Sequence, residues 1–133
     1  MKKFPVNLHD AFSESQRLGI CKCASLQVYA EKIGNLQKKV ENDIIDDYED
    51  RFKVLANSSR LKIIGFLIKQ QRSCICEIVT VFAMDRGTLS YHLKMLKNIG
   101  LIKMKKVGKS KLILLTENYK NILPKDVISH FTN

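Results

Sequence analysis

Apolar side chains recur at steps of three and four residues from Ile33 to Leu55, which is the spacing of one helix face. They predict a long helix over residues 33–55, with one apolar stripe formed by Ile33, Leu36, Val40, Ile44, Tyr48, Phe52 and Leu55. Such a helix either covers the core of its own subunit or pairs with a second copy of the chain, and the pattern allows both. Residues 1–32 are predicted to be an extension with a short helical piece at 10–18.

Three shorter helices are predicted next along the chain. They cover residues 60–70, 74–82 and 86–98. N-cap candidates at residues 57–59 and at Asp85 stand before the first and the last of them. Gly100 follows the last helix, where a glycine commonly ends a helix.

The hydrophobic period then changes to that of strands. Residues 101–106 and 109–115 predict two strands joined near Gly108, with basic side chains at the tip of the hairpin. A final segment, residues 118–131, predicts a short or interrupted helix. The order of elements predicts a mainly α fold with a small β-hairpin. Residues 33–133 would form a winged helix-turn-helix, in which one helix enters the major groove of DNA and the hairpin rests on the flanking backbone.

Charge is unevenly distributed along the 133 residues. The net charge is +10, and it divides into −2 for residues 1–50 and +12 for residues 51–133. Between Arg86 and Lys111 there are eight basic residues and no acidic one. A run without interspersed carboxylates favours a polyanionic partner, so we expect this protein to bind double-stranded DNA.

The predicted helix over residues 86–98 suits the major groove, because its leucines share one face and its polar residues the other. Arginine can pair with guanine through two hydrogen bonds, and hydroxyl groups and lysines reach base edges or phosphates. The candidate DNA-binding residues lie on this helix and on the hairpin. They are Arg86, Gly87, Thr88, Ser90, Tyr91, His92, Lys94, Lys103, Lys105, Lys106, Lys109 and Lys111.

The composition is that of an ordinary globular protein, 45% hydrophobic and 27% charged. No stretch approaches the ~18 apolar residues of a membrane helix, and the basic start of the chain is followed by no apolar region. We therefore expect a soluble, cytoplasmic protein, no membrane partner, and cysteines that remain thiols. The sequence has no glycine-rich phosphate loop or nucleophile elbow, so we expect no enzyme activity.

The four cysteines form two Cys-x-Cys pairs, Cys21 with Cys23 and Cys74 with Cys76. One buried cysteine usually acts as a small hydrophobic residue, but two identical spacings are hard to attribute to packing. Thiolates bind soft ions, and two converging pairs would offer three or four sulfur ligands. Because residues i and i+2 of a helix diverge by about 200°, a chelating pair needs a helix terminus or extended backbone. Residues 73–76 lie at a predicted helix start, where the helix dipole favours thiolates.

Three segments resemble the ArsR/SmtB family of bacterial and archaeal repressors. They are RFKVLANSSRLKII at residues 51–64, SCICEI at 73–78 and LSYHLKMLKNIGLI at 89–102. The family pattern has a helix start of the form leu-ala-x-x-x-arg, a cysteine box and a recognition helix of the form ser-x-his-leu-x-x-leu. The resemblance covers residues 51–116 and implies a homodimeric repressor that leaves its operator DNA when a metal or metalloid ion binds.

The cysteine layout is similar to that of the cadmium- and lead-sensing members of this family. In those members, cysteines from the N-terminal extension of the partner subunit complete the cysteine box on the first helix of the DNA-binding motif. The resemblance therefore implies that Cys21, Cys23, Cys74 and Cys76 are metal ligands. It also implies a thiophilic inducer, Cd(II), Pb(II), Zn(II), As(III) or Sb(III).

The sequence departs from the family pattern at several positions. Ala83 stands where the turn of the motif often has glycine, and Gly87 lies inside the recognition helix. Val79 stands where the arsenic-type members have a third thiolate. Asp126 and His130 do not fit the spacing of the family's other metal site on the C-terminal helix.

Two other functions remain open on the same residues. The thiols can form a redox switch in a regulator of this fold, although Cys-x-x-Cys is the commoner redox spacing. Alternatively, the four thiolates hold a structural zinc ion in a nucleic-acid-binding protein, so that DNA binding requires metal. Metal binding under reductant, followed by loss of DNA binding, is expected only for the inducer-responsive repressor.

Overall fold

The computed structural model describes residues 7–132 of the chain, which divides into two compact units, Met1–Asp46 and Asp47–Asn133. The first unit contains helix α1 (Leu8–Arg17), helix α2 (Leu26–Val40) and the start of helix α3 (Asp43–Leu55). None of the helices in the described residues is long and apolar enough to cross a membrane.

In the first unit, α1 and α2 pack against each other through an aromatic contact. The ring centroids of Phe12 and Tyr29 are 5.2 Å apart, and the hydroxyl of Tyr29 lies 3.4 Å from that of Ser15. Asn7 caps the start of α1, and Ser25 caps the start of α2. The predicted helical piece at residues 10–18 is therefore confirmed.

The prediction of one continuous helix over residues 33–55 is wrong, because α2 ends at Val40 and α3 begins at Asp43. The side chain of Asn42 makes one hydrogen bond on each side of this break. Its amide donates to the carbonyl of Lys39 at 2.7 Å, and its carbonyl oxygen accepts from the backbone N–H of Ile44 at 3.0 Å. Asn42 thus satisfies a terminal group of each helix, and an asparagine followed by acidic residues is a recognisable helix start.

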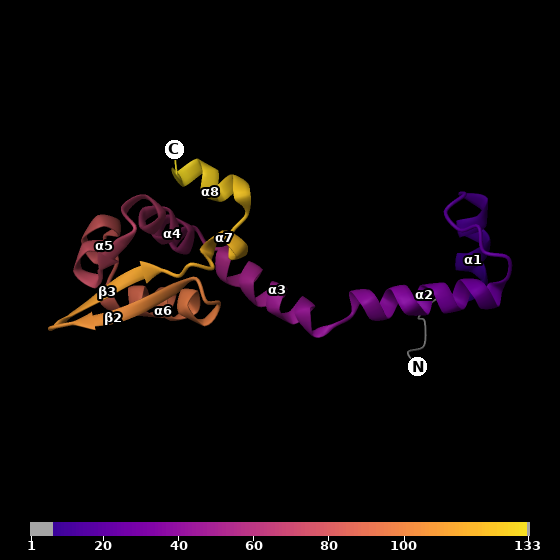
Figure 1. Ribbon diagram of the computed structural model, residues 1–133, viewed down its shortest axis with the longest axis horizontal. Helices are drawn as coiled ribbons and strands as arrows, with labels where there is room; N and C mark the ends of the chain where they lie inside the picture. The colour runs from indigo at the N-terminus through magenta and orange to yellow at the C-terminus, as the bar shows by residue number, and fades with distance from the viewer. Residues whose placement is uncertain (1–6, 133) are drawn as a thin grey trace. The chain divides into compact units, whose positions relative to one another are not determined.

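The second unit holds the remainder of α3 and a small helical domain with one sheet (Figure 1). Its further elements are α4 (Ser58–Gln70), β1 (Arg72–Cys74), α5 (Ile75–Phe82), α6 (Arg86–Asn98), β2 (Ile102–Val107), β3 (Ser110–Leu115), α7 (Tyr119–Ile122) and α8 (Lys125–Thr132). The predicted helices, the hairpin and the interrupted C-terminal helix are confirmed.

The sheet has three antiparallel strands in the order β1-β3-β2. The hairpin of β2 and β3 was predicted, whereas β1 was not. β1 has only three residues, and Ser73 at its centre pairs with Ile113, far along the chain. A strand this short has no periodicity of its own and is held by its partner.

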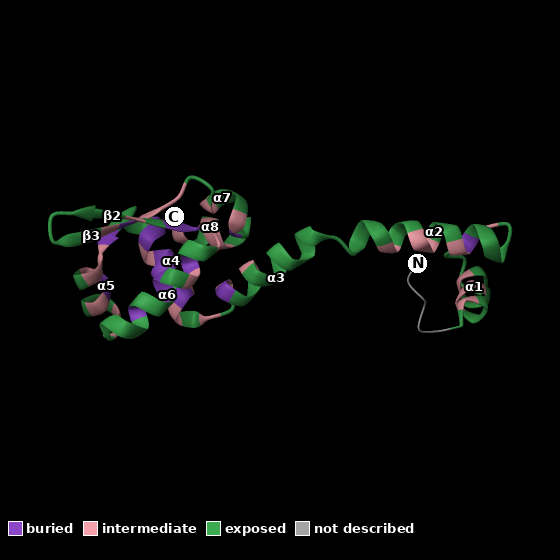
Figure 2. Ribbon diagram, turned by 90° about the horizontal axis from the view of Figure 1, so that it is seen from below, coloured by how far each residue is buried: buried purple, intermediate pink, exposed green. Residues whose placement is uncertain are grey.

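The core of the second unit lies between α4, α5, α6 and the sheet. Figure 2 shows that buried residues concentrate on α4 and α6. The largest fully buried side chains are Ile63, Ile64, Leu67, Ile78, Leu89, Leu93, Leu96, Leu101 and Ile113. The three leucines of α6 form the predicted inner face, so the opposite face of this helix remains exposed.

The turn between α5 and α6 keeps its tight geometry without a glycine. Ala83 ends α5 in the left-handed conformation, with φ 49° and ψ 46°. Asp85 caps α6 as predicted, because its carboxylate accepts hydrogen bonds from the backbone N–H and the hydroxyl of Thr88, both at 2.8 Å. These bonds lower the pKa of Asp85, since they stabilise the charged form. The departure from the family pattern at Ala83 leaves the helix-turn-helix intact.

Helix α8 packs on α4 through a close contact that requires glycine. A β-carbon at Gly65 would lie 2.6 Å from Cε1 of Phe131, inside van der Waals contact.

We expect Gly65→Leu to lower the free energy of unfolding by roughly 2 kcal/mol, because the added atoms push the ring away. Denaturant unfolding measures this loss. Gly34→Leu is the matched control in helix α2, where nothing beyond the adjoining residues and the helix's own backbone lies within 4 Å of the place that a β-carbon would take. Equal stability changes in the two variants would contradict the packing argument.

Candidate DNA-binding surface and cysteine pairs

The exposed face of α6 carries most of the predicted DNA-binding residues of this helix. Arg86, Gly87, Thr88, Ser90, Tyr91 and Lys94 are all exposed. They alternate with the buried leucines, because the capped helix start sets which face turns to the core. The face therefore offers one guanidinium, one ammonium and three hydroxyl groups to a ligand.

Unlike the other predicted DNA-binding residues of α6, His92 is buried, with only 8% of its surface exposed. Its Nδ1 accepts a hydrogen bond from Nε of Arg60 at 3.2 Å. Burial lowers the pKa of His92, and the charge of Arg60 lowers it further. The structure thus places this side chain among the groups that hold α6 against α4, apart from the exposed face.

Arg60 is a structural residue for which the residue pattern predicted no role. It is 7% exposed, and its Nη1 donates to the carbonyl of Val54 at 3.2 Å. Its guanidinium also lies over the ring of Tyr91, 5.5 Å from the centroid. Arg60 therefore connects the end of α3, the start of α4 and the recognition helix α6. Its place as the arginine of the family motif leu-ala-x-x-x-arg is the sequence feature that could have identified it.

We expect the free energy of unfolding to fall as the pH drops below about 6.5, the ordinary pKa of histidine. The folded protein resists protonation of His92, whereas the unfolded chain accepts it, so acid favours unfolding until the lowered pKa is passed. Denaturant unfolding at a series of pH values measures this slope. His92→Gln, which retains a hydrogen-bond acceptor and does not titrate, is expected to flatten it. An unchanged slope in this variant would assign the acid sensitivity to other groups.

The lysines predicted for DNA contact on the hairpin are all exposed, at positions 103, 105, 106, 109 and 111. Lys106 and Lys111 are directly opposed near the end of the β2–β3 ladder. No carboxylate in residues 7–132 forms an ion pair with any of these lysines. Like charges opposed across two strands repel each other, so this tip favours an anionic partner.

Cys21 and Cys23 form a local pair in the first unit. Cys21 is 5% exposed, and its sulfur accepts a hydrogen bond from the backbone N–H of Cys23 at 3.2 Å. Burial raises the pKa of Cys21, but the hydrogen bonds from Cys23 and the charge of Lys32 outweigh it, so the net pKa is lowered. The hydrogen bond to Cys21, burial and the neighbouring thiolate raise the pKa of Cys23. The pair therefore favours one thiolate, on Cys21.

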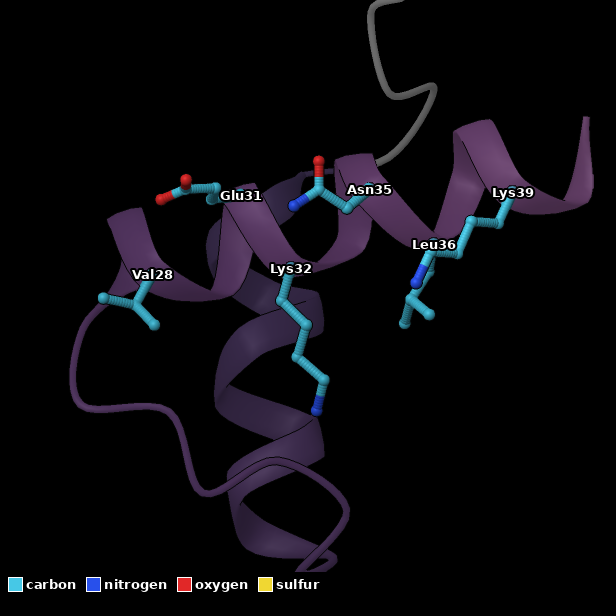
Figure 3. Close-up of a pocket in the computed structure, with 6 residues that line it drawn as sticks. All are labelled: Val28, Glu31, Lys32, Asn35, Leu36 and Lys39. Atoms are coloured by element: carbon cyan, nitrogen blue, oxygen red, sulfur yellow. The ribbon is translucent and has the colours of Figure 1, made fainter.

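Lys32, the cation beside this pair, belongs to an open hollow on helix α2. The hollow is lined by Val28, Glu31, Lys32, Asn35, Leu36 and Lys39, all on this one helix (Figure 3). A face of a single helix with mixed charges has no enclosing wall, which small-molecule sites normally have.

Cys74 and Cys76 occupy the junction of β1 and α5 in the second unit. Cys74 is the last residue of β1 and the N-cap of α5, with extended backbone angles. Cys76 lies in the first turn of α5 and is exposed. The pair thus has the combination of extended backbone and helix start that a Cys-x-Cys chelate needs.

The sulfur of Cys76 already has one partner, which is the guanidinium of Arg86. Nη2 of Arg86 donates a hydrogen bond to Sγ of Cys76 at 3.1 Å. This contact joins the first turn of α5 to the first residue of the recognition helix. From the sequence, Arg86 is a candidate DNA contact and Cys76 a candidate metal ligand, and their spacing does not indicate that they touch.

The structure brings the predicted ligands together only as pairs. Within residues 7–132, no group of three or more His, Cys, Asp or Glu side chains is arranged to hold a metal ion. All four cysteines are free thiols. Soft sulfur donors suit a thiophilic ion and not a hard cation such as Mg²⁺.

Comparison with known proteins identifies the helix-turn-helix. A family model described as "Bacterial regulatory protein, arsR family" matches residues 57–104, from the start of α4 into the hairpin. Residues 57–104 are therefore similar to the DNA-binding domain of ArsR-family regulators. This confirms the resemblance drawn from the sequence, and the fold class with it.

Two curated relatives and one solved structure agree with this match. A cadmium resistance transcriptional regulatory protein, the CadC homolog of Staphylococcus aureus, is 29% identical over 65% of this chain and 72% of its own. An arsenical resistance operon repressor of Bacillus subtilis is 34% identical over 48% of this chain and 61% of its own. The homodimeric winged helix-turn-helix DNA-binding domain of a Mycobacterium bovis protein matches with a TM-score of 0.51 and 26% identity, over 68% and 81% of the two chains.

The matched family and the relatives are DNA-binding transcriptional regulators. Proteins of this kind are not enzymes, which agrees with the expectation from the sequence. Cadmium resistance and arsenical resistance are the functions for which these two relatives are named.

Proposed function

We propose that this protein is a homodimeric, cytoplasmic repressor that releases its operator DNA when a thiophilic metal or metalloid ion binds its cysteines. The observation that carries the proposal is the position of Cys74 and Cys76 at the start of α5, the first helix of the DNA-binding motif. An ion held there acts on the helix that packs against the recognition helix. The relative named for cadmium resistance supports the same class of inducer.

The proposed ligands are the thiolates of Cys21, Cys23, Cys74 and Cys76. Residues 1–32 would supply the first pair, and residues 33–133 would supply the second pair, the DNA-binding motif and the dimer contacts. Cys21 favours the thiolate that a soft ion requires, and Cys76 is exposed to an incoming ion. Thiolates accept Cd(II), Pb(II), Zn(II), As(III) and Sb(III), so the donor set defines a class of inducer.

DNA recognition is proposed for the exposed face of α6 and for the hairpin. Arg86, Ser90 and Lys94 would reach base edges or phosphates in the major groove. The hairpin lysines would contact the flanking phosphates, where they would add affinity without sequence preference. His92 would act through Arg60, by holding α6 in place.

A second copy of this chain is the proposed partner of the apolar side chains on α2 and α3. Large apolar side chains that are exposed in the single chain include Leu36, Val40, Ile44, Ile45, Tyr48 and Phe52. Exposed apolar patches of this kind commonly mark interaction sites, and the related Mycobacterium bovis domain is a homodimer.

We expect the wild-type protein to sediment as a dimer at micromolar concentration and Ile44→Asp to sediment as a monomer, because a buried charge opposes association. Sedimentation velocity measures both states. Asp46→Lys is the matched control, since it changes charge on the same helix at a position that already carries charge. A monomeric wild type would contradict the proposed dimer.

The experiment that tests the function is a fluorescence anisotropy titration. The operator candidate is the DNA upstream of this protein's own gene, and each ion is added separately under reductant. The proposal expects tight binding without metal, and release by at least one thiophilic ion at a fixed stoichiometry. DNA binding only in the presence of metal would favour a structural zinc site.

A redox switch is the second candidate, because Cys21 and Cys23 are hydrogen-bonded to each other and Cys21 favours the thiolate. It expects release by an oxidant without metal, reversed by reductant. Mass spectrometry of the released protein would then show the loss of two hydrogens for each disulfide formed.

A further inference from the structure

The contact between Arg86 and Cys76 joins two residues with separate proposed roles. Arg86 is the first residue of the recognition helix and is exposed on its DNA-binding face. Cys76 lies in the first turn of α5 and is one of the proposed metal ligands. Nη2 of Arg86 lies 3.1 Å from Sγ of Cys76, so the guanidinium that would read DNA is already in contact with the thiol that would bind the ion.

We propose that Arg86 is the coupling residue of this regulator, shared between operator DNA and Cys76. This inference rests on the proposed function. A neutral thiol is a weak acceptor, and a guanine edge or a phosphate is a stronger one that can bind guanidinium bidentately. In the metal-free protein, operator DNA therefore takes Arg86 from Cys76.

The competition between DNA and Cys76 for Arg86 reverses when the cysteines bind an ion. Ligation of an ion requires a thiolate, so the thiol of Cys76 would release its proton to solvent and its sulfur would gain negative charge. The N–H to sulfur bond of Arg86 then becomes charge-assisted, and charge-assisted hydrogen bonds are about twice as strong as neutral ones. Arg86 stays on Cys76 and is lost to the operator.

This mechanism differs from a displacement of the whole recognition helix. A displaced helix loses all its DNA contacts together, whereas capture of Arg86 removes one contact and keeps α6 on its core of leucines. One good bidentate contact to guanine accounts for roughly a 5- to 150-fold change in affinity. Such a factor is within the ordinary range of allosteric coupling.

The test compares Arg86→Gln with Lys94→Gln in the full chain. Lys94 is exposed on the same helix, and no cysteine contact involves it in the described part of the chain. Operator affinity is measured by anisotropy, without metal and with Cd(II) under reductant. Metal stoichiometry is followed separately by the ligand-to-metal charge-transfer absorbance of the thiolates.

Both variants are expected to bind the operator more weakly without metal. Lys94→Gln is expected to keep the wild-type ratio of metal-free to Cd(II)-loaded affinity, whereas Arg86→Gln is expected to bring that ratio close to one. Cd(II) stoichiometry is expected to stay unchanged in both. Because coupling is reciprocal, operator DNA should weaken Cd(II) binding by the wild type and not by Arg86→Gln.

A full wild-type ratio in Arg86→Gln, with Cd(II) bound, would overturn the coupling role and leave the proposed function standing. Failure of the wild type to bind Cd(II) or to release DNA would overturn the proposed function itself. Arg86→Lys tests the role of charge separately, because it keeps the positive charge and loses the bidentate hydrogen bonding of the guanidinium. We expect it to recover part of the coupling, and a Lys variant identical to Gln in every measurement would argue against electrostatic capture.

Discussion

Cys74→Ser and Cys76→Ser proteins are expected to bind the operator with wild-type affinity under reductant and to remain bound when Cd(II) is added. The wild type is expected to lose operator affinity by roughly 5- to 150-fold under the same conditions. Serine preserves the size of the side chain but is a poor ligand for a soft ion, so the helix start of α5 and Arg86 no longer respond. Anisotropy with labelled operator measures both affinities.

Cys21→Ser and Cys23→Ser are the companion variants for this experiment. They remove ligands from the first unit and leave the pair on the DNA-binding motif in place. We expect weaker metal binding and a partial response at higher ion concentration. If Cys74→Ser protein still dissociates at the wild-type Cd(II) concentration, the cysteines of α5 do not sense the inducer.

Raising the monovalent salt concentration from about 50 mM to about 200 mM is expected to weaken operator binding by about 10³-fold or more. Eight basic residues lie between Arg86 and Lys111, and the exposed hairpin lysines form no ion pair with a carboxylate in residues 7–132. Each phosphate contact releases a counterion, so Lys105→Ala and Lys109→Ala should each reduce the salt slope by about one. The measurement is anisotropy at a series of salt concentrations, on operator and on random DNA.

The hairpin lysines and Arg86 should differ in their effects on operator and random DNA. Changes at Lys105 and Lys109 are expected to weaken binding to operator and random DNA alike. Arg86→Ala is expected to weaken operator binding more than random binding, because a base contact carries sequence preference. Equal effects on both DNAs from all three variants would contradict the assignment of α6 as the recognition helix.

Local signals in the sequence were enough to predict the helix-turn-helix. The start of α6 follows from Asp85, whose carboxylate caps the helix within three residues, and its inner face follows from the leucine spacing. The hairpin follows from alternation around Gly108, which adopts a positive φ of 62°. Such features depend on neighbouring residues, so they can be recognised without any knowledge of the fold.

The break between α2 and α3 was also local, but the apolar stripe concealed it. Periodicity continued through Asn42, while the side chain of Asn42 ended one helix and began the next. A capping residue competes with helix continuation through hydrogen bonds that hydrophobic spacing does not report. Five residues of the stripe, Leu36, Val40, Ile44, Tyr48 and Phe52, are exposed in the single chain, whereas Leu55 packs against the core of the second unit.

The contacts between separate elements depended on the tertiary structure. Arg60 meets His92 across 32 positions of the chain, and Arg86 meets Cys76 across 10. The sequence identified the thiols, Arg86 and His92 as candidates because residue type and spacing carry that chemistry, whereas it gave Arg60 no role. Packing of α4, α5 and α6 around the buried leucines determined which of these side chains touch, since contacts between separate elements depend on how those elements dock.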